Sequence, residues 1–344
     1  MTIADYIIET LSKRVSHAYG VYGAANAHLF DAIKRQLKLQ MICTAGEQGA
    51  GFAAEGHAKA TSGIGLCITT SGPGALNAAT SVANCHYDSV PVLFLCGQVS
   101  TKVMRRDYSS LRQRGFQECA VVDVMKPISK YCREIREPHE VKEALDSALQ
   151  MMTMGRPGPA VLSLPLDVLS APVPAKWPAP FISETLPDNT PSPDVAQVHG
   201  CLTALRRAER PIILVGGGCR ESASAVRRFA ETVGVHVFRT WNALDIAPDD
   251  WPLYGGNVGT YGGKGRNFAV QQADFALVLG CRLSGRITGG ATKSFLRGAR
   301  AGEGIWHVDA DYGVIEELEQ DVPNRKKIRA YVDAFLRVAQ ESLG

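Results

Sequence analysis

The 344-residue sequence lacks several features that would assign it to a broad class. Its formal net charge is only +3, and no run of lysine and arginine exceeds a few residues, which argues against a nucleic-acid partner. No apolar stretch approaches the roughly 20 residues that a membrane-spanning helix needs. Residues 1–13 are typical of an amphipathic helix and not of a signal peptide. We therefore expect a cytoplasmic protein that binds neither membrane nor nucleic acid.

Cysteine and histidine are present but form no recognisable pattern. The nine cysteines are odd in number and show no C-x-x-C spacing, which argues against a disulfide framework and a zinc site. The eight histidines are dispersed, without an H-x-x-x-H pair. Cys67 and Cys96 lie in apolar runs, where small buried thiols are common. We expect reduced cysteines and no metal site in this chain.

What the sequence does contain is an alternation of short apolar runs with helical patterns, which is typical of parallel α/β folds. In the first half, apolar runs without clean alternation predict strands buried on both faces, at residues 39–44, 64–70, 90–97 and 159–165. Helices are predicted over residues 1–13, 48–61 and 140–152. The second of these is rich in alanine and glycine, so it can approach its neighbours closely.

A change of composition divides the chain. Residues 171–193 are rich in proline, which predicts a stiff connection. The strands expected after it lie at residues 210–218, 235–238, 274–280 and 304–311. A closing helix is predicted over 325–343, with the basic cluster 325–329 on its exposed face. The sequence thus predicts two doubly wound parallel-sheet α/β domains in series, over residues 1–170 and 194–344.

Two glycine-rich turns stand out against this background. The segment GEQGAGFAAEGHAKAT (residues 46–61) carries the carboxylate of Glu47 at the start of a helix, and SGPGALN (71–77) follows the next strand. A carboxylate there can simply stabilise the helix N-terminus. The glycines 216–218 fit a phosphate-binding turn only loosely, because neither G-x-G-x-x-G nor G-x-x-x-x-G-K-[ST] occurs. Nucleotide binding and a purely structural turn both remain open.

The order of these motifs resembles thiamine-diphosphate enzymes of the acetolactate synthase type. The matching positions are Glu47, Ala53, Ala54, Gly56, Ala58, Ala60, Thr61, Gly72, Pro73, Gly74, Asn77, Asp88, Pro91, Gly97, Gln98 and Val99. GFQE (115–118), GRPGPAVLSLPLDV (155–168), GCRLSGRITGG (280–290) and IWHVDAD (305–311) continue the likeness. The resemblance covers essentially the whole chain and implies a pyrimidine-binding domain followed by the family's middle domain.

The resemblance also implies roles for particular residues. Glu47 takes the place of the glutamate that hydrogen-bonds N1′ of the cofactor's aminopyrimidine and helps the thiazolium C2 lose its proton. The other implied positions are cofactor contacts at Tyr22, Gly72, Pro73 and Asn77, catalytic glutamines at Gln98 and Gln117, and a substrate pocket at Phe116 and Gln117. A core role for Phe116 and a simple turn at 72–77 are the structural alternatives. Glu55, in mid-helix, is expected at a surface or interface.

One part of the family's pattern is missing. Its third domain carries G-D-G and, 25 to 30 residues later, an asparagine that together hold Mg²⁺ and the diphosphate, and no G-D-G occurs here. The resemblance therefore implies that a second subunit supplies this domain in a hetero-oligomer, in which the pyrimidine domains also pair. A fragment cut at a domain boundary is the alternative. The initial methionine and the closing helix favour the natural split.

We expect the subunit of a carboligase or decarboxylase that acts on a 2-oxo acid, with pyruvate as the donor. The alternatives are a non-catalytic binding or regulatory subunit, a nucleotide-binding protein, and an enzyme similar to 2-hydroxyacyl-CoA lyase or oxalyl-CoA decarboxylase. Gly217, Arg282 and Asp309 are the candidates for a nucleotide site. Ser284 and Gly285 replace two aspartates of the family, so FAD, another adenine nucleotide and an empty middle domain all remain open.

Overall fold

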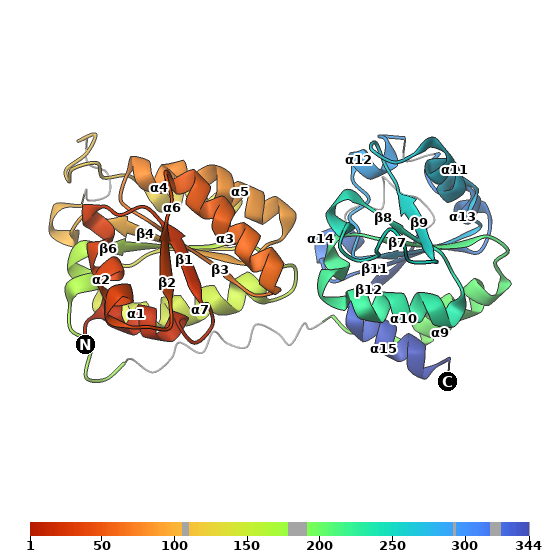
Figure 1. The fold of residues 1–344 in the computed structure, drawn as a ribbon, viewed down its shortest axis with the longest axis horizontal. Helices are drawn as coiled ribbons and strands as arrows, with labels where there is room; N and C mark the ends of the chain where they lie inside the picture. Colours follow the sequence, from red (N-terminus) through yellow and green to blue (C-terminus); the bar gives the residue numbers. More distant parts are fainter. Residues whose placement is uncertain (105–109, 178–190, 292–293, 317–324, 344) are drawn as a thin grey trace. The chain divides into compact units, whose positions relative to one another are not determined.

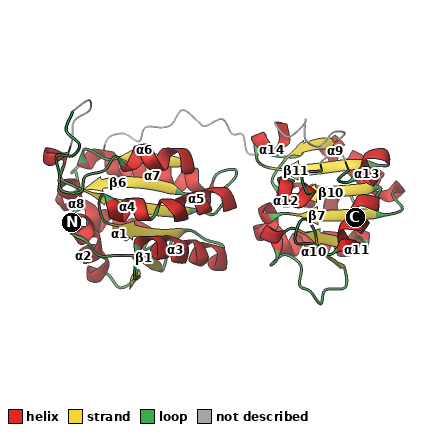
Figure 2. Ribbon diagram, turned by 90° about the horizontal axis from the view of Figure 1, so that it is seen from above, coloured by secondary structure: helices red, strands yellow, loops and turns green. Residues whose placement is uncertain are grey.

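Two parallel six-stranded sheets, each flanked by helices, form the protein (Figures 1 and 2). The computed structural model describes residues 1–104, 110–177, 191–291, 294–316 and 325–343. The chain divides into two units, residues 1–187 and 188–344. The predicted fold class, two parallel-sheet α/β domains in series, is confirmed. Most of the proline-rich connection expected over 171–193 lies outside the described residues, and the predicted domain boundaries stay predictions.

The sheet of the first unit has the strand order β2-β1-β3-β4-β6-β5. Its strands are β1 (His17–Gly20), β2 (Gln40–Cys43), β3 (Gly65–Thr69), β4 (Val92–Gln98), β5 (Tyr131–Glu134) and β6 (Ala160–Pro165). Its helices are α1 (Ile3–Leu11), α2 (Ala27–Arg35), α3 (Glu47–Thr61), α4 (Pro73–Asn77), α5 (Ala79–Asp88), α6 (Val121–Met125), α7 (Val141–Thr153) and α8 (Leu166–Ser170).

The sheet of the second unit has the order β12-β11-β10-β7-β8-β9, which is the doubly wound order of dinucleotide-binding folds. Its strands are β7 (Pro211–Val215), β8 (Val237–Arg239), β9 (Tyr254–Asn257), β10 (Phe275–Leu279), β11 (Gly304–Asp309) and β12 (Arg325–Arg329). Its helices are α9 (Val195–Arg207), α10 (Ala223–Val233), α11 (Lys264–Gln272), α12 (Gly285–Thr288), α13 (Arg297–Ala301), α14 (Tyr312–Glu316) and α15 (Val332–Glu341).

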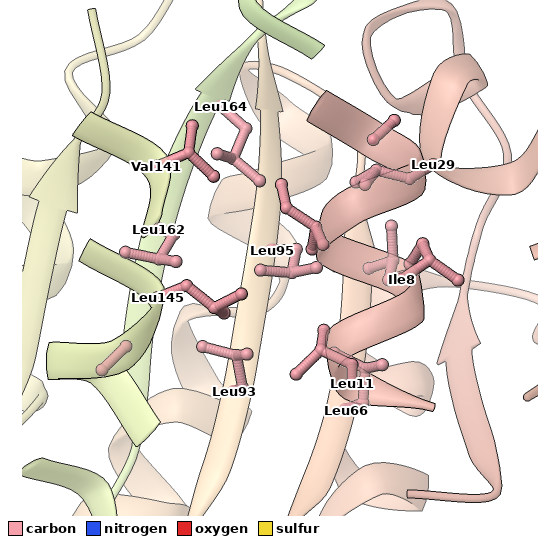
Figure 3. Close-up of a cluster of buried hydrophobic side chains, with 14 of the residues drawn as sticks. Ile8, Leu11, Leu29, Leu66, Leu93, Leu95, Val141, Leu145, Leu162 and Leu164 are labelled. Carbon is pink, nitrogen blue, oxygen red and sulfur yellow. The ribbon is translucent and has the colours of Figure 1, made fainter. Parts of the chain in front are cut away.

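The central strands of the first unit are apolar on both faces because helices cover both. On β4, Leu93 and Leu95 point into the core under α1, α2 and α7 (Figure 3). The alternate residues Val92 and Phe94 join the core on the opposite face, with alanines of α3. This two-sided burial explains why the sequence shows a continuous apolar run here instead of alternation.

Small residues let α3 and α5 approach closely, as the composition of α3 predicts. A Cβ atom on Gly51 would lie 1.9 Å from Ser81 Oγ, so only glycine fits at this crossing. Ala50, Ala54 and Ala58 pack in the same core.

The helix α1 begins with a capping box. Thr2 caps it by accepting a hydrogen bond from Asp5 N, while the Asp5 carboxylate accepts one from Thr2 N.

Two expectations about secondary structure are wrong. Residues 325–329 form β12, and not the first turns of a helix; α15 begins only at Val332. Arg325 is buried and donates to the carbonyl oxygens of Val314 and Ile315, while Lys326 stays exposed at this sheet edge, where a charge discourages pairing with another strand. The run at 39–44 was expected to be a buried strand, but β2 is an edge strand on which Ile42 and Cys43 are exposed.

The cysteines behave as the sequence predicts. All nine lie in the described residues as free thiols, and Cys67 and Cys96 are buried in β3 and β4. Burial raises the pKa of Cys67 well above its ordinary value and that of Cys96 to about 11, although the Thr69 side chain lowers the latter in part. These two thiols therefore stay protonated and unreactive at neutral pH.

None of the described helices combines the length and the apolar character needed to cross a membrane.

Candidate functional site

The candidate site lies at the carboxyl ends of the strands in the first unit. From β1 the chain passes outward to β2, whereas β3 lies on the other side of β1. In open α/β sheets a crevice forms at such a reversal, between the segments that follow the two strands, here residues 21–26 and 70–77. Open α/β sheets bind their ligands at such a switch point.

Glu47 is the first residue of α3 and is only 9% exposed. Asn77, the last residue of α4, donates from Nδ2 to Glu47 Oε2 over 3.0 Å. The other oxygen, Oε1, lies against Gly74, where a Cβ atom would come within 2.9 Å of it and within 2.6 Å of Thr70 Cγ2. Asn77 thus orients the Glu47 carboxylate, and Gly74 allows it to pack closely because glycine has no side chain.

The segment after β1 closes against the segment after β3. The buried Asn26 accepts from Gly23 N over 2.8 Å and donates to Val21 O over 2.9 Å, so its side chain fixes the turn. A Cβ atom on Gly23 would lie 2.4 Å from Thr70 Oγ1. Asn26 did not emerge from the sequence, although an asparagine that bonds backbone groups in a turn is a common device.

Tyr22 lies in this same turn and is 64% exposed. Its ring meets the edge of Phe30, with the ring centroids 5.4 Å apart. The backbone of Tyr22 therefore borders the crevice, while its ring is directed to α2 and to solvent. Its predicted contact with the cofactor stays a prediction.

A second close approach joins residues 72 and 117. Gly72 and Gln117 both have positive φ, 57° and 54°, and a Cβ atom on Gly72 would lie 2.0 Å from Gln117 O. A left-handed conformation costs a non-glycine residue such as Gln117 about 1 to 2 kcal/mol, so its surroundings must hold it there. Phe116, beside it, is 80% exposed and is therefore not a core residue.

We expect Gly72→Ala to lower the free energy of unfolding by at least about 2 kcal/mol, because the methyl group adds a collision to the left-handed strain. Gly56→Ala is the matched control. It lies on the exposed side of α3, where a Cβ atom would meet none of the described residues within 4 Å, and should stabilise by roughly 0.5 to 1 kcal/mol. Urea unfolding of both variants measures the difference, and equal effects would contradict the steric argument.

Of the predicted residues, Glu47, Gly72, Pro73, Asn77 and Gln117 come together at the crevice. Gln98, by contrast, lies beneath them at the end of β4 and is fully buried. Its amide bonds to backbone groups of Val99 and Cys119. The structure therefore brings these five predicted positions together, while Gln98 is buried at the end of β4 and bonds to backbone groups.

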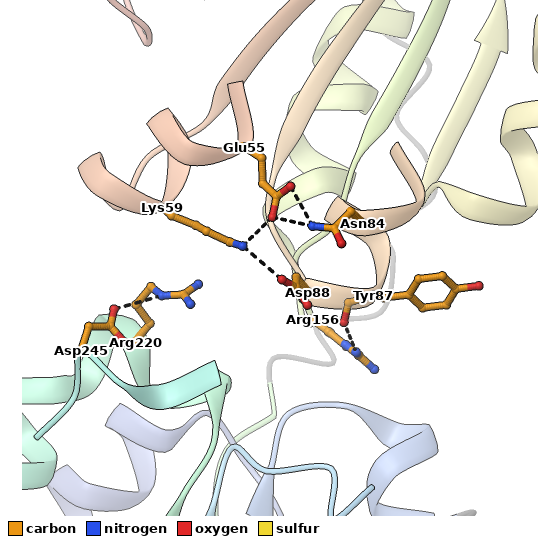
Figure 4. Close-up of polar contacts among 8 residues, drawn as sticks. All are labelled: Glu55, Lys59, Asn84, Tyr87, Asp88, Arg156, Arg220 and Asp245. Carbon is orange, nitrogen blue, oxygen red and sulfur yellow. Dashed lines mark hydrogen bonds and ion pairs between the residues drawn. The ribbon is translucent and has the colours of Figure 1, made fainter. Parts of the chain in front are cut away.

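Glu55 was expected at a surface or interface, and this is wrong, because it is buried within the first unit. Figure 4 shows its polar partners. Asn84 Nδ2 donates to both of its carboxylate oxygens over 2.9 Å. Lys59 also bonds to Glu55 and, over 3.1 Å, to Asp88. Burial lowers the pKa of Lys59, but its bonds to Glu55 and Asp88 outweigh this and raise it overall. The four side chains tie α3 to α5 and so steady the helix that begins with Glu47.

In the second unit, Gly217 and Arg282 follow β7 and β10, and Asp309 is the last residue of the neighbouring strand β11, so all three lie at the carboxyl ends of adjacent strands. The glycines there have a structural explanation, since a Cβ atom on Gly216 would lie 2.2 Å from Gly280 O. Asp309 Oδ1 accepts from Asp311 N over 2.9 Å.

Two exposed aromatic residues that the sequence did not single out, Trp241 and Tyr261, also lie in this unit, 5.5 Å apart between ring centroids. Figure 4 shows a further ion pair of the same unit, in which Arg220 Nε lies 3.2 Å from Asp245 Oδ2.

Comparison with known families accounts for both units. Residues 1–125 match the thiamine pyrophosphate enzyme N-terminal TPP binding domain, and residues 198–337 match the central domain of the same enzymes. The chain therefore belongs to the thiamine pyrophosphate enzymes, whose cofactor is also called thiamine diphosphate, and contains their N-terminal and central domains. The resemblance found in the motifs is confirmed.

Within this family the chain is similar to acetolactate synthases. It is 35% identical to a probable acetolactate synthase large subunit of Methanocaldococcus jannaschii, over 93% of this chain and 53% of the relative. It is 32% identical to the acetolactate synthase large subunit of Corynebacterium glutamicum, over 94% and 50%. A probable chloroplastic acetolactate synthase 2 of rice (Oryza sativa subsp. japonica) is 32% identical over 90% and 45%. The chain spans about half the length of the curated relatives it matches.

Proposed function

We propose that this chain supplies the pyrimidine-binding part of an acetolactate-synthase-like enzyme that acts on a 2-oxo acid, with pyruvate as the donor. The observation that carries the proposal is the carboxylate of Glu47, oriented by Asn77 and cradled by Gly74 at the switch point of the sheet. Similarity to acetolactate synthases over at least nine-tenths of this chain supports it.

The residues at the crevice fit the aminopyrimidine end of thiamine diphosphate. When bound, this cofactor supplies an electron sink for breaking and forming bonds next to a carbonyl carbon. Glu47 would hold a proton at the ring nitrogen N1′, and Asn77 would keep the carboxylate in place by donating to Oε2. Gly72 and Gly74 have no side chain, so Gln117 and Glu47 can lie directly against them. Phe116 and Gln117 would border the substrate and shield it from water.

The diphosphate and Mg²⁺ need oxygen-rich ligands. The described residues hold no group of three or more His, Cys, Asp or Glu side chains suited to a metal, and the sequence has no G-D-G. We therefore propose that a second subunit carrying the G-D-G…N signature holds both, in a hetero-oligomer in which the pyrimidine-binding domains also pair. The alternative is a binding or regulatory subunit without turnover of its own.

Co-expression with a candidate chain that carries G-D-G…N tests this proposal. We expect a stable complex that releases CO₂ from pyruvate in the presence of thiamine diphosphate and Mg²⁺, whereas either chain alone is inactive. A stable complex without turnover on pyruvate or on longer 2-oxo acids would favour the regulatory alternative. Turnover by this chain alone would contradict the need for a second subunit.

For the second unit we propose an adenine-nucleotide site at Gly217, Arg282 and Asp309, with FAD as one candidate. The doubly wound strand order supports a ligand at the carboxyl ends of the paired strands β7 and β10, where the order reverses. Ser284 and Gly285 stand where the family has aspartates, which argues against FAD. Flavin absorbance of the purified chain, and calorimetric titration with ADP, distinguish FAD, another adenine nucleotide and an unliganded domain.

A further inference from the structure

The segment between β4 and α6, described over residues 99–104 and 110–120, begins directly after Gln98 and carries Phe116 and Gln117. We propose that Gln98 and Asp167 are positioning residues that clamp this segment from the ends of two neighbouring strands. The clamp itself concerns only this chain. Its effect on substrate binding rests on the proposed function.

Gln98 joins the two ends of the segment through its amide. Its Oε1 accepts from Val99 N over 2.9 Å, at the point where the segment begins. Its Nε2 donates to Cys119 O over 2.9 Å, at the point where the segment returns. The orientation of the amide follows from these partners, because one is a donor and the other an acceptor. With both ends bonded and the side chain fully buried, Gln98 cannot touch a substrate in this arrangement.

Hydrogen bonds and a close backbone contact also hold residues 114–118 in place. Glu118 Oε2 accepts from the backbone N of Arg114 over 3.0 Å and of Gly115 over 3.1 Å. Gly115 passes directly over Val99, since a Cβ atom on Gly115 would lie 2.7 Å from Val99 Cγ2. Residues 114–118 therefore form a tight turn that packs against Val99, the first residue of the segment. Gly115 is buried, while Phe116 and Gln117 are exposed.

Asp167 supplies the second anchor. It lies in α8, directly after the neighbouring strand β6. Gln98 of β4 is paired in register with Pro165 of β6, so the residues after each strand leave the sheet side by side. Asp167 accepts from Thr101 N over 3.0 Å and from Thr101 Oγ1 over 2.6 Å. Burial raises the pKa of Asp167, but the hydrogen bonds from Thr101 and Ser100 outweigh it and lower the pKa overall. The carboxylate is thus ionised at neutral pH, as the anchor requires.

Trypsin can report on the clamp without any cofactor or partner. The bond after Arg114 lies in the clamped return, while the bond after Arg112 lies just before it among exposed residues. In Gln98→Met, which keeps the length but not the hydrogen bonds, we expect cleavage after Arg114 to rise about tenfold relative to cleavage after Arg112. Gln150→Met makes the same change at an exposed position of α7 and should leave the ratio unchanged.

A second variant separates the clamp from a general loss of stability. In Gln98→Glu, a protonated carboxyl can still donate to Cys119 O and accept from Val99 N, whereas a carboxylate cannot donate. Burial raises the pKa of an introduced carboxyl. We therefore expect the cleavage ratio to be near that of the wild type at pH 6 and near that of Gln98→Met at pH 8.5. A ratio that does not depend on pH in this variant, or no increase in Gln98→Met, overturns the proposal.

The assembled enzyme gives an independent measurement. There, Gln98→Met should raise KM for the 2-oxo acid about tenfold and leave the Kd of thiamine diphosphate unchanged, because the contacts of Glu47 do not involve Gln98. An unchanged KM together with an increased cleavage ratio would limit the clamp to a structural role and overturn its link to substrate. If no assembly shows turnover, the proposed function fails, while the proteolysis result still decides whether the clamp exists.

Discussion

Glu47→Gln should reduce the turnover of the assembled enzyme by roughly 10²- to 10⁴-fold, the range expected when a group that transfers or holds a proton is lost. Glutamine keeps the size of the side chain and an oxygen that can accept from Asn77. It cannot exchange a proton with a ring nitrogen as a carboxyl group can. The substitution should therefore remove the chemistry and leave the architecture in place.

Steady-state CO₂ release and unfolding in urea together test this expectation. Glu9→Gln is the matched control, because Glu9 is 62% exposed on α1 and has only a surface ion pair with Lys13; it should lose no activity. If Glu47→Gln retained near-normal turnover, the carboxylate would serve only the N-terminus of α3 and the proposed mechanism would be wrong. If it lost stability as well as turnover, the loss of activity would say nothing about proton transfer.

Acidification should destabilise the second unit through His307. This side chain is buried in β11, bonds through Nε2 to Cys281 O over 2.9 Å, and through Nδ1 meets Arg325 Nη1 at 2.9 Å. Burial, with a smaller effect from the charge of Arg325, lowers the pKa of His307 from 6.5 to about 3. Because Arg325 can only donate, Nδ1 must accept, and the ring must stay neutral in the folded protein.

The direction of the pH effect follows from that pKa. Below pH 6.5 the unfolded chain binds a proton on this histidine, while the folded protein does not until about pH 3. The free energy of unfolding should therefore fall as the pH is lowered through this window, by about 1.4 kcal/mol per pH unit at most. Between pH 6.5 and pH 4.5 the expected loss is about 2 to 3 kcal/mol.

His307→Gln should remove much of this pH dependence, because a glutamine amide can accept from Arg325 and donate to Cys281 O but does not titrate. Tryptophan fluorescence in urea follows the unfolding, since Trp241, Trp251 and Trp306 all belong to the second unit. His236→Gln, at an exposed histidine of the same unit, is the control. Equal pH dependence in the wild type and in His307→Gln would show that other groups govern acid unfolding.

How far the sequence predicts this protein depends on where each residue lies in its sheet. Central strands such as β4 and β10 are buried on both faces and can be recognised in the sequence as apolar runs. The strands β5, β9 and β12 lie at sheet edges, and their sequences YCRE, YGGN and RKKIR give no such signal. β1 is short and was also missed. Edge strands are shaped by pairing on one side only, which a local pattern does not record.

The candidate site shows a similar division. Motif spacing predicts that Glu47, Gly72 and Asn77 matter, and the structure brings them together. Motif spacing could not predict that the Gln98 side chain bonds to backbone groups and does not face the crevice. That depends on the position of Cys119, some twenty residues later in the chain, whose carbonyl oxygen accepts from Gln98. For the same reason Asn26 was missed and Glu55 was placed wrongly: their partners are set by local turns and by helix packing, not by spacing in a motif.

The Glu55 carboxylate has a consequence for how this protein can change over evolutionary time. It is the buried member of its set, while Lys59, Asn84 and Asp88 are only partly buried. Removing Lys59 or Asn84 would leave the buried carboxylate with fewer partners, which typically costs about 1 to 3 kcal/mol. Exchange of Glu55 and its partners together for apolar residues of similar volume can be nearly neutral. We therefore expect these positions to change together more readily than one at a time.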